Sequence, residues 1–153
     1  MIAVAALVAS TAVWMALEAR VSAREPHAHL PRELATGLLL LAVHVTAIAV
    51  PGPARMFGLG LALIAAGVAL RVSSIHALGP AFVSTTSAPV RLVRAGPYRW
   101  MRHPSELGLL AAAVGAAVLM TSVAAAGVII LGLAPLILVR CAAEDRTISR
   151  WAR

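Results

Sequence analysis

The chain is divided by five long apolar runs. They cover about residues 1–17, 34–50, 56–72, 105–120 and 123–139 of 153. A helix needs about 17–25 apolar residues to cross the hydrocarbon of a bilayer, so the runs lie at the short end of that range. Only 12% of the residues are charged, compared with about 25% in an ordinary soluble domain. These features predict an all-α integral membrane protein with five transmembrane helices.

The charges are concentrated on one side of the expected helices. All 13 basic residues are arginines, and the net charge is +7. With five spans, Arg55 lies alone on one side and the other arginines lie on the opposite side. Positively charged loops stay in the cytoplasm, so we expect the N-terminus outside and the C-terminus in the cytoplasm. Trp14, Trp100 and Trp151 are expected at that cytoplasmic face as interfacial anchors.

The same pattern bears on location and partners. Arginines that lie between apolar runs do not form the basic surface that nucleic-acid binding requires, so no nucleic-acid partner is expected. Membrane lipids are the expected surroundings. The absence of lysine beside abundant alanine is typical of a GC-rich genome. We therefore expect a multi-pass protein of a bacterial cytoplasmic membrane; its oligomeric state is not readable from the sequence.

The connections between the runs predict a single domain over residues 1–153. The segments 51–55 and 121–122 are short enough to be tight turns, and the second predicts a helical hairpin between the last two spans. The segment 73–104 is the one long connection after the first loop, and long loops are usually functional. We expect this loop and the tail 140–153 to form the functional site at the cytoplasmic face.

The stretch Gly96 to Pro104, with the sequence GPYRWMRHP, is the densest polar part of the chain. Its first two residues are typical of a turn. Pro104 suits the first position of a helix, where its missing N–H costs nothing. Free N–H groups at that helix start could meet an anion or another ligand. His103 is therefore a candidate ligand contact, with capping of the helix as the alternative.

Glu106 is a candidate catalytic group one turn into the same helix. Two structural alternatives remain open. Glutamate at the third helical position suits the helix dipole and can bond back to the cap. It also follows Arg102 by four residues, which is an ion-pair spacing. If burial dominates instead, Glu106 could act as an acid or base on the substrate.

Glu144 and Asp145 follow the fifth apolar run. They could be a solvated helix end, balanced by Arg140 and Arg146. Adjacent carboxylates could also hold an ammonium group, which needs anionic acceptors.

Polar and small residues within the expected spans have simpler explanations. His44 could pack against a neighbouring carbonyl group as readily as serve a function. Gly58, Gly60 and Gly67 are expected to allow close helix contact. Cys141 is alone, so it forms no internal disulfide, and no pair of residues has the spacing of a metal site.

The motifs resemble the isoprenylcysteine carboxyl methyltransferase family of membrane proteins. The resemblance rests on Gly96-Pro97-Tyr98, Arg102-His103-Pro104, Leu78-Gly79, Phe82, Leu92-Val93, Arg140 and Glu144-Asp145. A second likeness is to phosphatidylethanolamine N-methyltransferase. It rests on Gly58-Leu59-Gly60, Ser73-Ser74 and Ala77-Leu78-Gly79. Together these likenesses cover about residues 56–148.

The resemblance implies S-adenosylmethionine as the cofactor and direct methyl transfer to a lipophilic or amphipathic small molecule. It implies that the cofactor lies at the cytoplasmic membrane face between the last helices and the long loop. The implied cofactor-binding residues are Gly96, Pro97, Tyr98, Arg102, His103, Pro104, Glu144 and Asp145. In this assignment Glu144 holds the cofactor ammonium. Glu106 and Arg140 are the implied catalytic residues, with Arg140 buttressing the site.

The chain departs from the family pattern in two places, and two other functions remain open. Glu106 stands where the family usually has tyrosine. The family usually continues beyond the acidic pair with a further helical segment, whereas here eight residues follow Asp145. One alternative is a membrane reductase that binds NADPH, although those enzymes usually have Asn-Tyr after Arg-His-Pro. The other is the same scaffold with altered catalysis or none.

Overall fold

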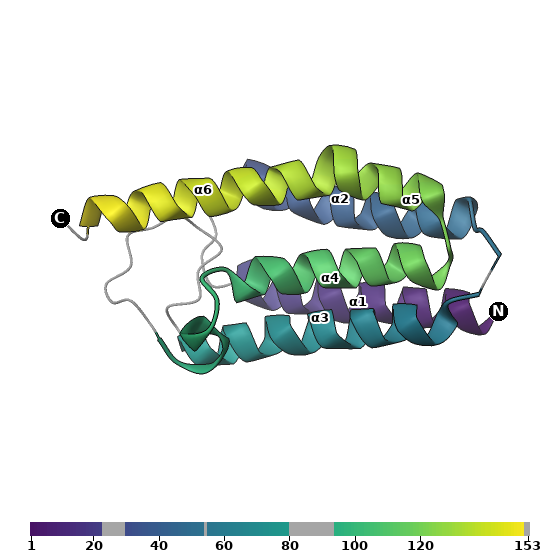
Figure 1. Cartoon of the computed structure of the whole chain (residues 1–153), viewed down its shortest axis with the longest axis horizontal. Helices are drawn as coiled ribbons and strands as arrows, with labels where there is room; N and C mark the ends of the chain where they lie inside the picture. Colours follow the sequence, from purple (N-terminus) through teal and green to yellow (C-terminus); the bar gives the residue numbers. More distant parts are fainter. Residues whose placement is uncertain (23–29, 54, 80–93, 152–153) are drawn as a thin grey trace.

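The computed structural model describes residues 1–22, 30–53, 55–79 and 94–151, and all regular structure in these ranges is helical. The elements are α1 (Ile2–Ser22), α2 (Leu30–Ala49), α3 (Phe57–Leu78), η2 (Gly96–Arg99), α4 (Pro104–Leu119), α5 (Val123–Val128), η3 (Ile129–Leu133) and α6 (Ala134–Trp151). α5, η3 and α6 follow one another without a break, and η3 is a π-helical turn within this long rod. The termini lie at opposite ends of the bundle (Figure 1). The all-helical prediction is confirmed.

The helices differ in their ability to cross a membrane. Two of them, Phe57–Leu78 and Val123–Arg146, are long and apolar enough to do so. The shorter apolar helices are Ile2–Leu17, Leu34–Ala49 and Pro104–Leu119. The number of transmembrane passes and the orientation of the termini remain predictions.

Two expected boundaries are wrong. The loop expected at 73–104 starts later, because α3 continues to Leu78 and ends at Gly79, whose φ of 54° suits glycine. The tail expected at 140–153 is a helix as far as Trp151, because α6 continues beyond the apolar run. Residues 80–93, which include Phe82 and Leu92-Val93, lie outside the described ranges.

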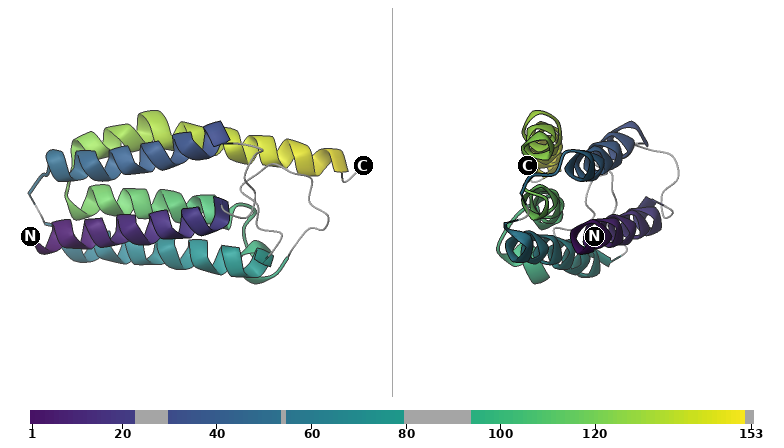
Figure 2. Two further views of the ribbon diagram at one scale, coloured as in Figure 1. Left: turned by 180° about the vertical axis from the view of Figure 1, so that it is seen from behind. Right: turned by 90° about the vertical axis from the view of Figure 1, so that its right-hand side faces the viewer.

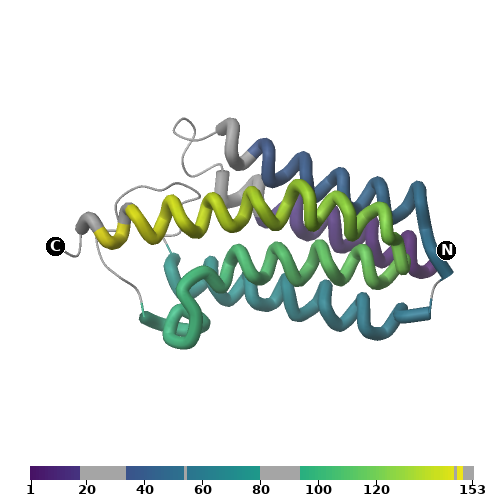
Figure 3. The backbone as a smooth tube through the Cα atoms, turned by 45° about the horizontal axis from the view of Figure 1, so that its top comes forward, coloured from purple at the N-terminus to yellow at the C-terminus, as the bar shows by residue number. Residues whose placement is uncertain are grey.

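The rods pack in a defined order around α4. Seen along the bundle, α4 lies between α3 and the α5–α6 rod, while α1 and α2 form the neighbouring side (Figure 2). The tube in Figure 3 shows that α6 extends beyond the start of α4 at the C-terminal end. This overhang brings the last turns of α6 to the loop that precedes α4.

Glycines allow α3 and α4 to approach closely. A Cβ atom on Gly67 would lie 2.5 Å from the carbonyl oxygen of Gly108, and a Cβ on Gly115 would lie 2.8 Å from that of Gly60. Since each helix spaces its two glycines seven residues apart, they recur on the same face. Close contact is confirmed for Gly60 and Gly67. It is wrong for Gly58, where a Cβ would meet nothing within 4 Å.

The turn between α4 and α5 confirms the expected hairpin. The Ser122 hydroxyl accepts a hydrogen bond from the N–H of Ala125 at 3.2 Å, which caps α5. The same hydroxyl donates to the Val50 carbonyl at 2.7 Å. Ser122 therefore joins the α2–α3 connection to the α4–α5 connection at this end of the bundle.

His44 contacts a neighbouring carbonyl group, which was the structural alternative expected for it. Its Nδ1 lies 2.8 Å from the Leu40 carbonyl oxygen one turn earlier on α2.

Candidate functional site

His103 is the N-cap residue of α4, but its side chain makes no capping hydrogen bond. The ring lies between two carboxylates of α6 instead. Nδ1 is 2.9 Å from Glu144 Oε2, and Nε2 is 3.2 Å from Asp145 Oδ1. The capping alternative is therefore wrong, and the histidine and acidic pair predicted from sequence form one group, which we call the outer cluster.

The outer cluster favours the imidazolium form of His103. The hydrogen bond to Glu144 raises the pKa of His103, burial opposes this rise, and the charges of Glu144 and Asp145 add to it. Both carboxylates remain about half exposed. Arg102 is 85% exposed and reaches Asp145 only at 3.9 Å. Because such an exposed pair contributes little, Arg102 does not form part of the cluster's core.

Glu106 and Arg140 form a second contact between α4 and α6. Glu106 Oε1 lies 3.1 Å from Arg140 Nη2, and Nη1 of the same guanidinium donates to Thr36 Oγ1 at 2.8 Å. The side chains of Glu106 and Arg140 are 11% and 18% exposed, so this is a buried ion pair. The predicted pairing of Glu106 with Arg102 is wrong. Arg140 likewise pairs with Glu106 rather than balancing Glu144.

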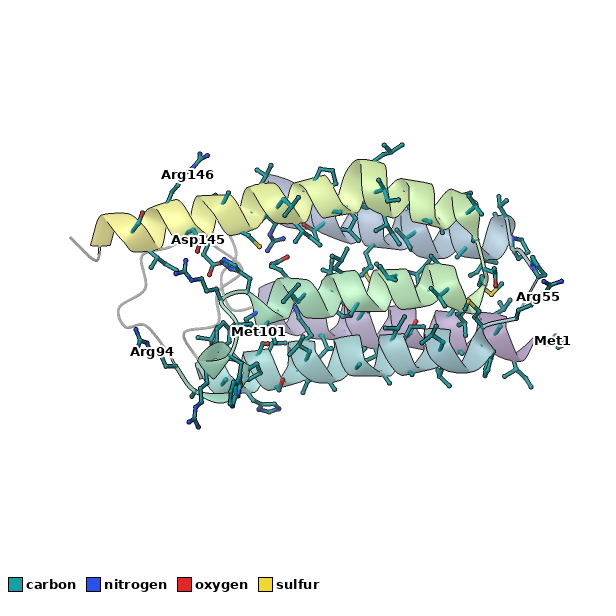
Figure 4. All side chains as sticks on the ribbon, in the orientation of Figure 1. Met1, Arg55, Arg94, Met101, Asp145 and Arg146 are labelled. Atoms are coloured by element: carbon teal, nitrogen blue, oxygen red, sulfur yellow. The ribbon has the colours of Figure 1, made fainter. Side chains whose placement is uncertain are left out.

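The two contacts follow from the spacing of the residues on antiparallel helices. His103 and Glu106 are three residues apart on α4, and Arg140 and Glu144 are four apart on α6. Either spacing places side chains on one helix face about one turn apart. The two contacts therefore lie one above the other along the helices. In the outer contact the cation is His103 on α4, and in the inner contact it is Arg140 on α6. Figure 4 shows Asp145 on the side of α6 that faces the bundle, whereas Arg146 points away.

A third polar contact lies between α1, α3 and α4. The buried guanidinium of Arg71 donates to Ser105 Oγ and lies 5.7 Å from the centroid of the Trp14 ring. Trp14 is 3% exposed, so its expected place among interfacial anchors is wrong. The sequence did not identify Ser105 or this role of Trp14. An arginine within an apolar run does signal that partners exist, but not which ones.

The predicted turn at Gly96-Pro97 is confirmed as the start of η2. Gly96 has a φ of 56°, and a Cβ there would lie 3.1 Å from that of Ala77, so glycine fits both the turn and its contact with α3. Tyr98 hydrogen-bonds to Ser74 on α3, and burial followed by the charge of Glu144 raises the pKa of the Tyr98 hydroxyl to about 12. Tyr98 is therefore a neutral phenol beside the outer cluster.

The structure thus places eight of the ten predicted site residues in three groups, and Pro104 and Arg102 lie outside them. The outer cluster contains His103, Glu144 and Asp145, and the inner pair contains Glu106 and Arg140. Gly96, Pro97 and Tyr98 lie on η2, which packs against α3. Pro104 occupies the first position of α4, as predicted, and is fully buried. Arg102 faces outward.

Two of the expected cofactor ligands have the chemistry that S-adenosylmethionine would need. Its amino acid part carries an ammonium group, and Glu144 and Asp145 present two neighbouring, partly exposed carboxylates at the end of the bundle. Carboxylates are the acceptors that form strong hydrogen bonds with such a group.

The comparisons with known proteins identify the family. No curated protein and no solved structure matches the chain. Residues 59–150 match the model of the isoprenylcysteine carboxyl methyltransferase (ICMT) family, and this match includes the outer cluster and the inner pair. The chain therefore belongs to the ICMT family, a family of membrane-embedded methyltransferases.

Proposed function

We propose that this chain transfers a methyl group from S-adenosylmethionine to a lipophilic or amphipathic acceptor at the cytoplasmic face of the membrane. Family membership supports methyl transfer in general. The cofactor, the class of acceptor and the membrane face are parts of the proposal.

The outer cluster is the observation that carries the proposal. Glu144 and Asp145 are held side by side on the ring of His103 and remain partly exposed. An incoming ammonium group would bind these carboxylates and share them with His103 or displace its ring. Tyr98 and η2 would form the wall beside the cofactor, because Tyr98 is close enough for the charge of Glu144 to affect its pKa.

Methyl transfer depends more on the relative position of the cofactor and the acceptor than on acid or base catalysis at the cofactor. When bound, S-adenosylmethionine supplies a sulfonium methyl group that a nucleophile attacks directly. Holding the two reactants in line and keeping water away both favour such a displacement. The side chains of Glu106 and Arg140 are only 11% and 18% exposed, so the side of the site that faces the bundle interior would give water little access.

The distribution of arginines supports the cytoplasmic face. Arg94 and Arg146 lie at the same end of the bundle as Asp145, whereas Arg55 and Met1 lie at the other end (Figure 4). Because arginine-rich ends stay in the cytoplasm, the outer cluster would face the compartment that supplies the cofactor.

Calorimetry on the full chain in lipid nanodiscs tests this function. S-adenosylhomocysteine, the product form of the cofactor, should bind to the wild-type chain and bind at least tenfold more weakly to Glu144→Gln, while Arg146→Gln serves as the matched control on the outward face of α6. Binding of NADPH in place of S-adenosylhomocysteine would favour the reductase alternative. Binding of neither would favour a scaffold without this cofactor chemistry.

A further inference from the structure

Among the described residues, only one oxygen of the buried Glu106 carboxylate has a partner. Oε1 contacts Arg140. Oε2 is buried as well, and no hydrogen-bond donor among the described residues reaches it. The whole residue is 8% exposed. Leaving a buried polar atom unpaired costs free energy, and the cost is larger for a charged group. Oε2 is therefore open to a hydrogen-bond donor from outside the described residues, and a bound molecule can supply it.

The surrounding contacts hold this oxygen in one place. Arg140 is fixed at two points, because its Nη2 contacts Glu106 and its Nη1 donates to Thr36 on α2. The guanidinium compensates the charge of Glu106 and restricts rotation of the carboxylate. Oε2 is thus a preorganised acceptor atom and not the mobile end of a surface side chain.

The location relates Oε2 to the candidate cofactor site. Glu106 lies three residues after His103 on α4, which is roughly 4.5 Å along the helix axis. A molecule that reaches Oε2 from the membrane interior would therefore meet the cofactor within about one helical turn. This separation is about the length of the carbon chain that joins the ammonium group of the cofactor to its sulfonium sulfur, so a methyl group at that sulfur would come near Oε2.

We propose that Glu106 Oε2 binds the N–H or O–H group of the methyl acceptor and takes up the proton that this group loses. The proposal rests on the proposed function. The acceptor atom forms a bond to the methyl carbon, the carbon–sulfur bond breaks with its electron pair left on sulfur, and the proton of the acceptor passes to Oε2. The charges balance, because one sulfonium cation disappears as one carboxylate is neutralised.

Methyl acceptors with an N–H or O–H group differ from a carboxylate acceptor in whether they have a proton to give up. An alcohol or phenol loses its proton on methylation, and a neutral primary or secondary amine becomes an ammonium that can give a proton to Oε2, whereas a carboxylate has no proton to lose. A carboxylate beside Oε2 would also place two like charges together in a low dielectric. The inferred substrate is therefore a lipophilic molecule with a neutral hydroxyl or amino group.

A matched series of probes tests the binding step without the cofactor. The four members share a dodecylphenyl body and carry hydroxyl, amino, carboxylate or hydrogen at the para position. Their affinities are measured by calorimetry on the full chain in nanodiscs. We expect the hydroxyl or the amino member to bind about tenfold more tightly than the unsubstituted member, since a charged acceptor forms the stronger hydrogen bond. Comparison of these two members shows which atom is preferred.

Two variants assign the preference to Glu106. Glu106→Gln keeps a hydrogen-bond acceptor but loses the charge, so the preference should fall to about threefold or less. The double variant Glu106→Leu with Arg140→Met removes the ion pair without leaving an unpaired charge, so it should fold and show no preference. Retention of the preference in the double variant would overturn the proposal. So would tighter binding of the carboxylate member or equal binding of all four members to the wild type.

A second measurement keeps this inference distinct from the proposed function. S-adenosylhomocysteine binding depends on the outer cluster and should be nearly unchanged in the double variant. If the wild type does not bind S-adenosylhomocysteine, methyl transfer from this cofactor is refuted. The probe series would still show whether Oε2 binds a hydroxyl or amino group. With tritiated cofactor, the bound hydroxyl or amino member should become methylated, and Glu106→Gln should lower its turnover about 100-fold or more. Turnover within a few-fold of the wild type would overturn the proton-transfer part.

Discussion

Oε1 of Glu106 on α4 lies 3.1 Å from Nη2 of Arg140 on α6. The two residues form a buried ion pair, about one helical turn further into the bundle than the outer cluster. A buried pair of this kind is weak evidence for stability, because both charges had to leave water. Its clearer consequence is positional. It joins α4 to α6 about one helical turn from the contacts of Glu144 and Asp145 with the ring of His103.

The first prediction concerns this inner pair. Arg140→Met alone should destabilise the fold by about 3–5 kcal/mol, because it leaves the Glu106 carboxylate buried without its counter-charge. Adding Glu106→Leu should recover most of that loss. Unfolding in detergent, followed by circular dichroism for the two single variants and the double variant, measures the coupling. Additive losses in the double variant would show that the two residues act independently.

The second prediction concerns the glycine contact between α3 and α4. Gly67→Ala should destabilise the chain by about 1–3 kcal/mol, because its Cβ would lie 2.5 Å from the Gly108 carbonyl oxygen and overpack the interface. Gly58→Ala on the same helix should be neutral or stabilise by up to about 1 kcal/mol, because its Cβ meets nothing. Thermal unfolding of both variants provides the comparison. Equal effects at the two positions would contradict close packing along this face.

The sequence was sufficient for the parts of the fold that depend on local patterns. Apolar runs predicted the helices, Gly96-Pro97 predicted a turn, and Pro104 predicted a helix start. Each of these is decided by residues adjacent in the chain. The helix ends were less predictable, because α3 and α6 continue as helices beyond the uninterrupted apolar runs, into segments where polar and apolar residues alternate irregularly.

The partners of the charged residues depended on tertiary structure. Arg102 and Arg140 both had helical spacing to an acid, yet Glu106 contacts the arginine on the other helix. Spacing within one helix cannot rank such competitors, because the outcome depends on which helix faces which. The buried position of Trp14 beside Arg71 is unpredictable for the same reason.

The third prediction concerns topology. A reporter fused after the C-terminus should be cytoplasmic and one fused before Met1 should be external, because all arginines except Arg55 lie on one side of the expected spans. Paired fluorescent and phosphatase fusions at each end measure this in cells. An external C-terminus would refute both the topology and the proposed position of the cofactor site.

The fourth prediction concerns the second acid of the outer cluster. Asp145→Asn should weaken binding of S-adenosylhomocysteine by about tenfold, because both carboxylates contact His103 and both are placed to accept from an ammonium group. The effect should be similar to that of Glu144→Gln when both are measured by calorimetry. Unchanged affinity in Asp145→Asn would assign the ammonium to Glu144 alone. Unchanged affinity in both variants would return the acids to a purely structural role.

The fifth prediction concerns the pH dependence of stability that His103 contributes. Its pKa in the folded chain is raised above the ordinary value of 6.5, mainly by the hydrogen bond to Glu144. A group of this kind stabilises the fold fully below its unfolded pKa, and the stabilisation is lost as the pH rises through the folded pKa. The unfolding temperature of the wild type should therefore exceed that of His103→Gln by several degrees near pH 6, and the difference should shrink towards about pH 9.

Two controls assign this pH dependence to the outer cluster. Glu144→Gln removes the main cause of the raised pKa, so in that background the effect of His103→Gln should be smaller and less dependent on pH. His76→Gln removes an exposed histidine from α3 and should not reproduce the effect. A difference between the wild type and His103→Gln that stays constant or grows with pH would mean that protonation of His103 does not hold α4 and α6 together.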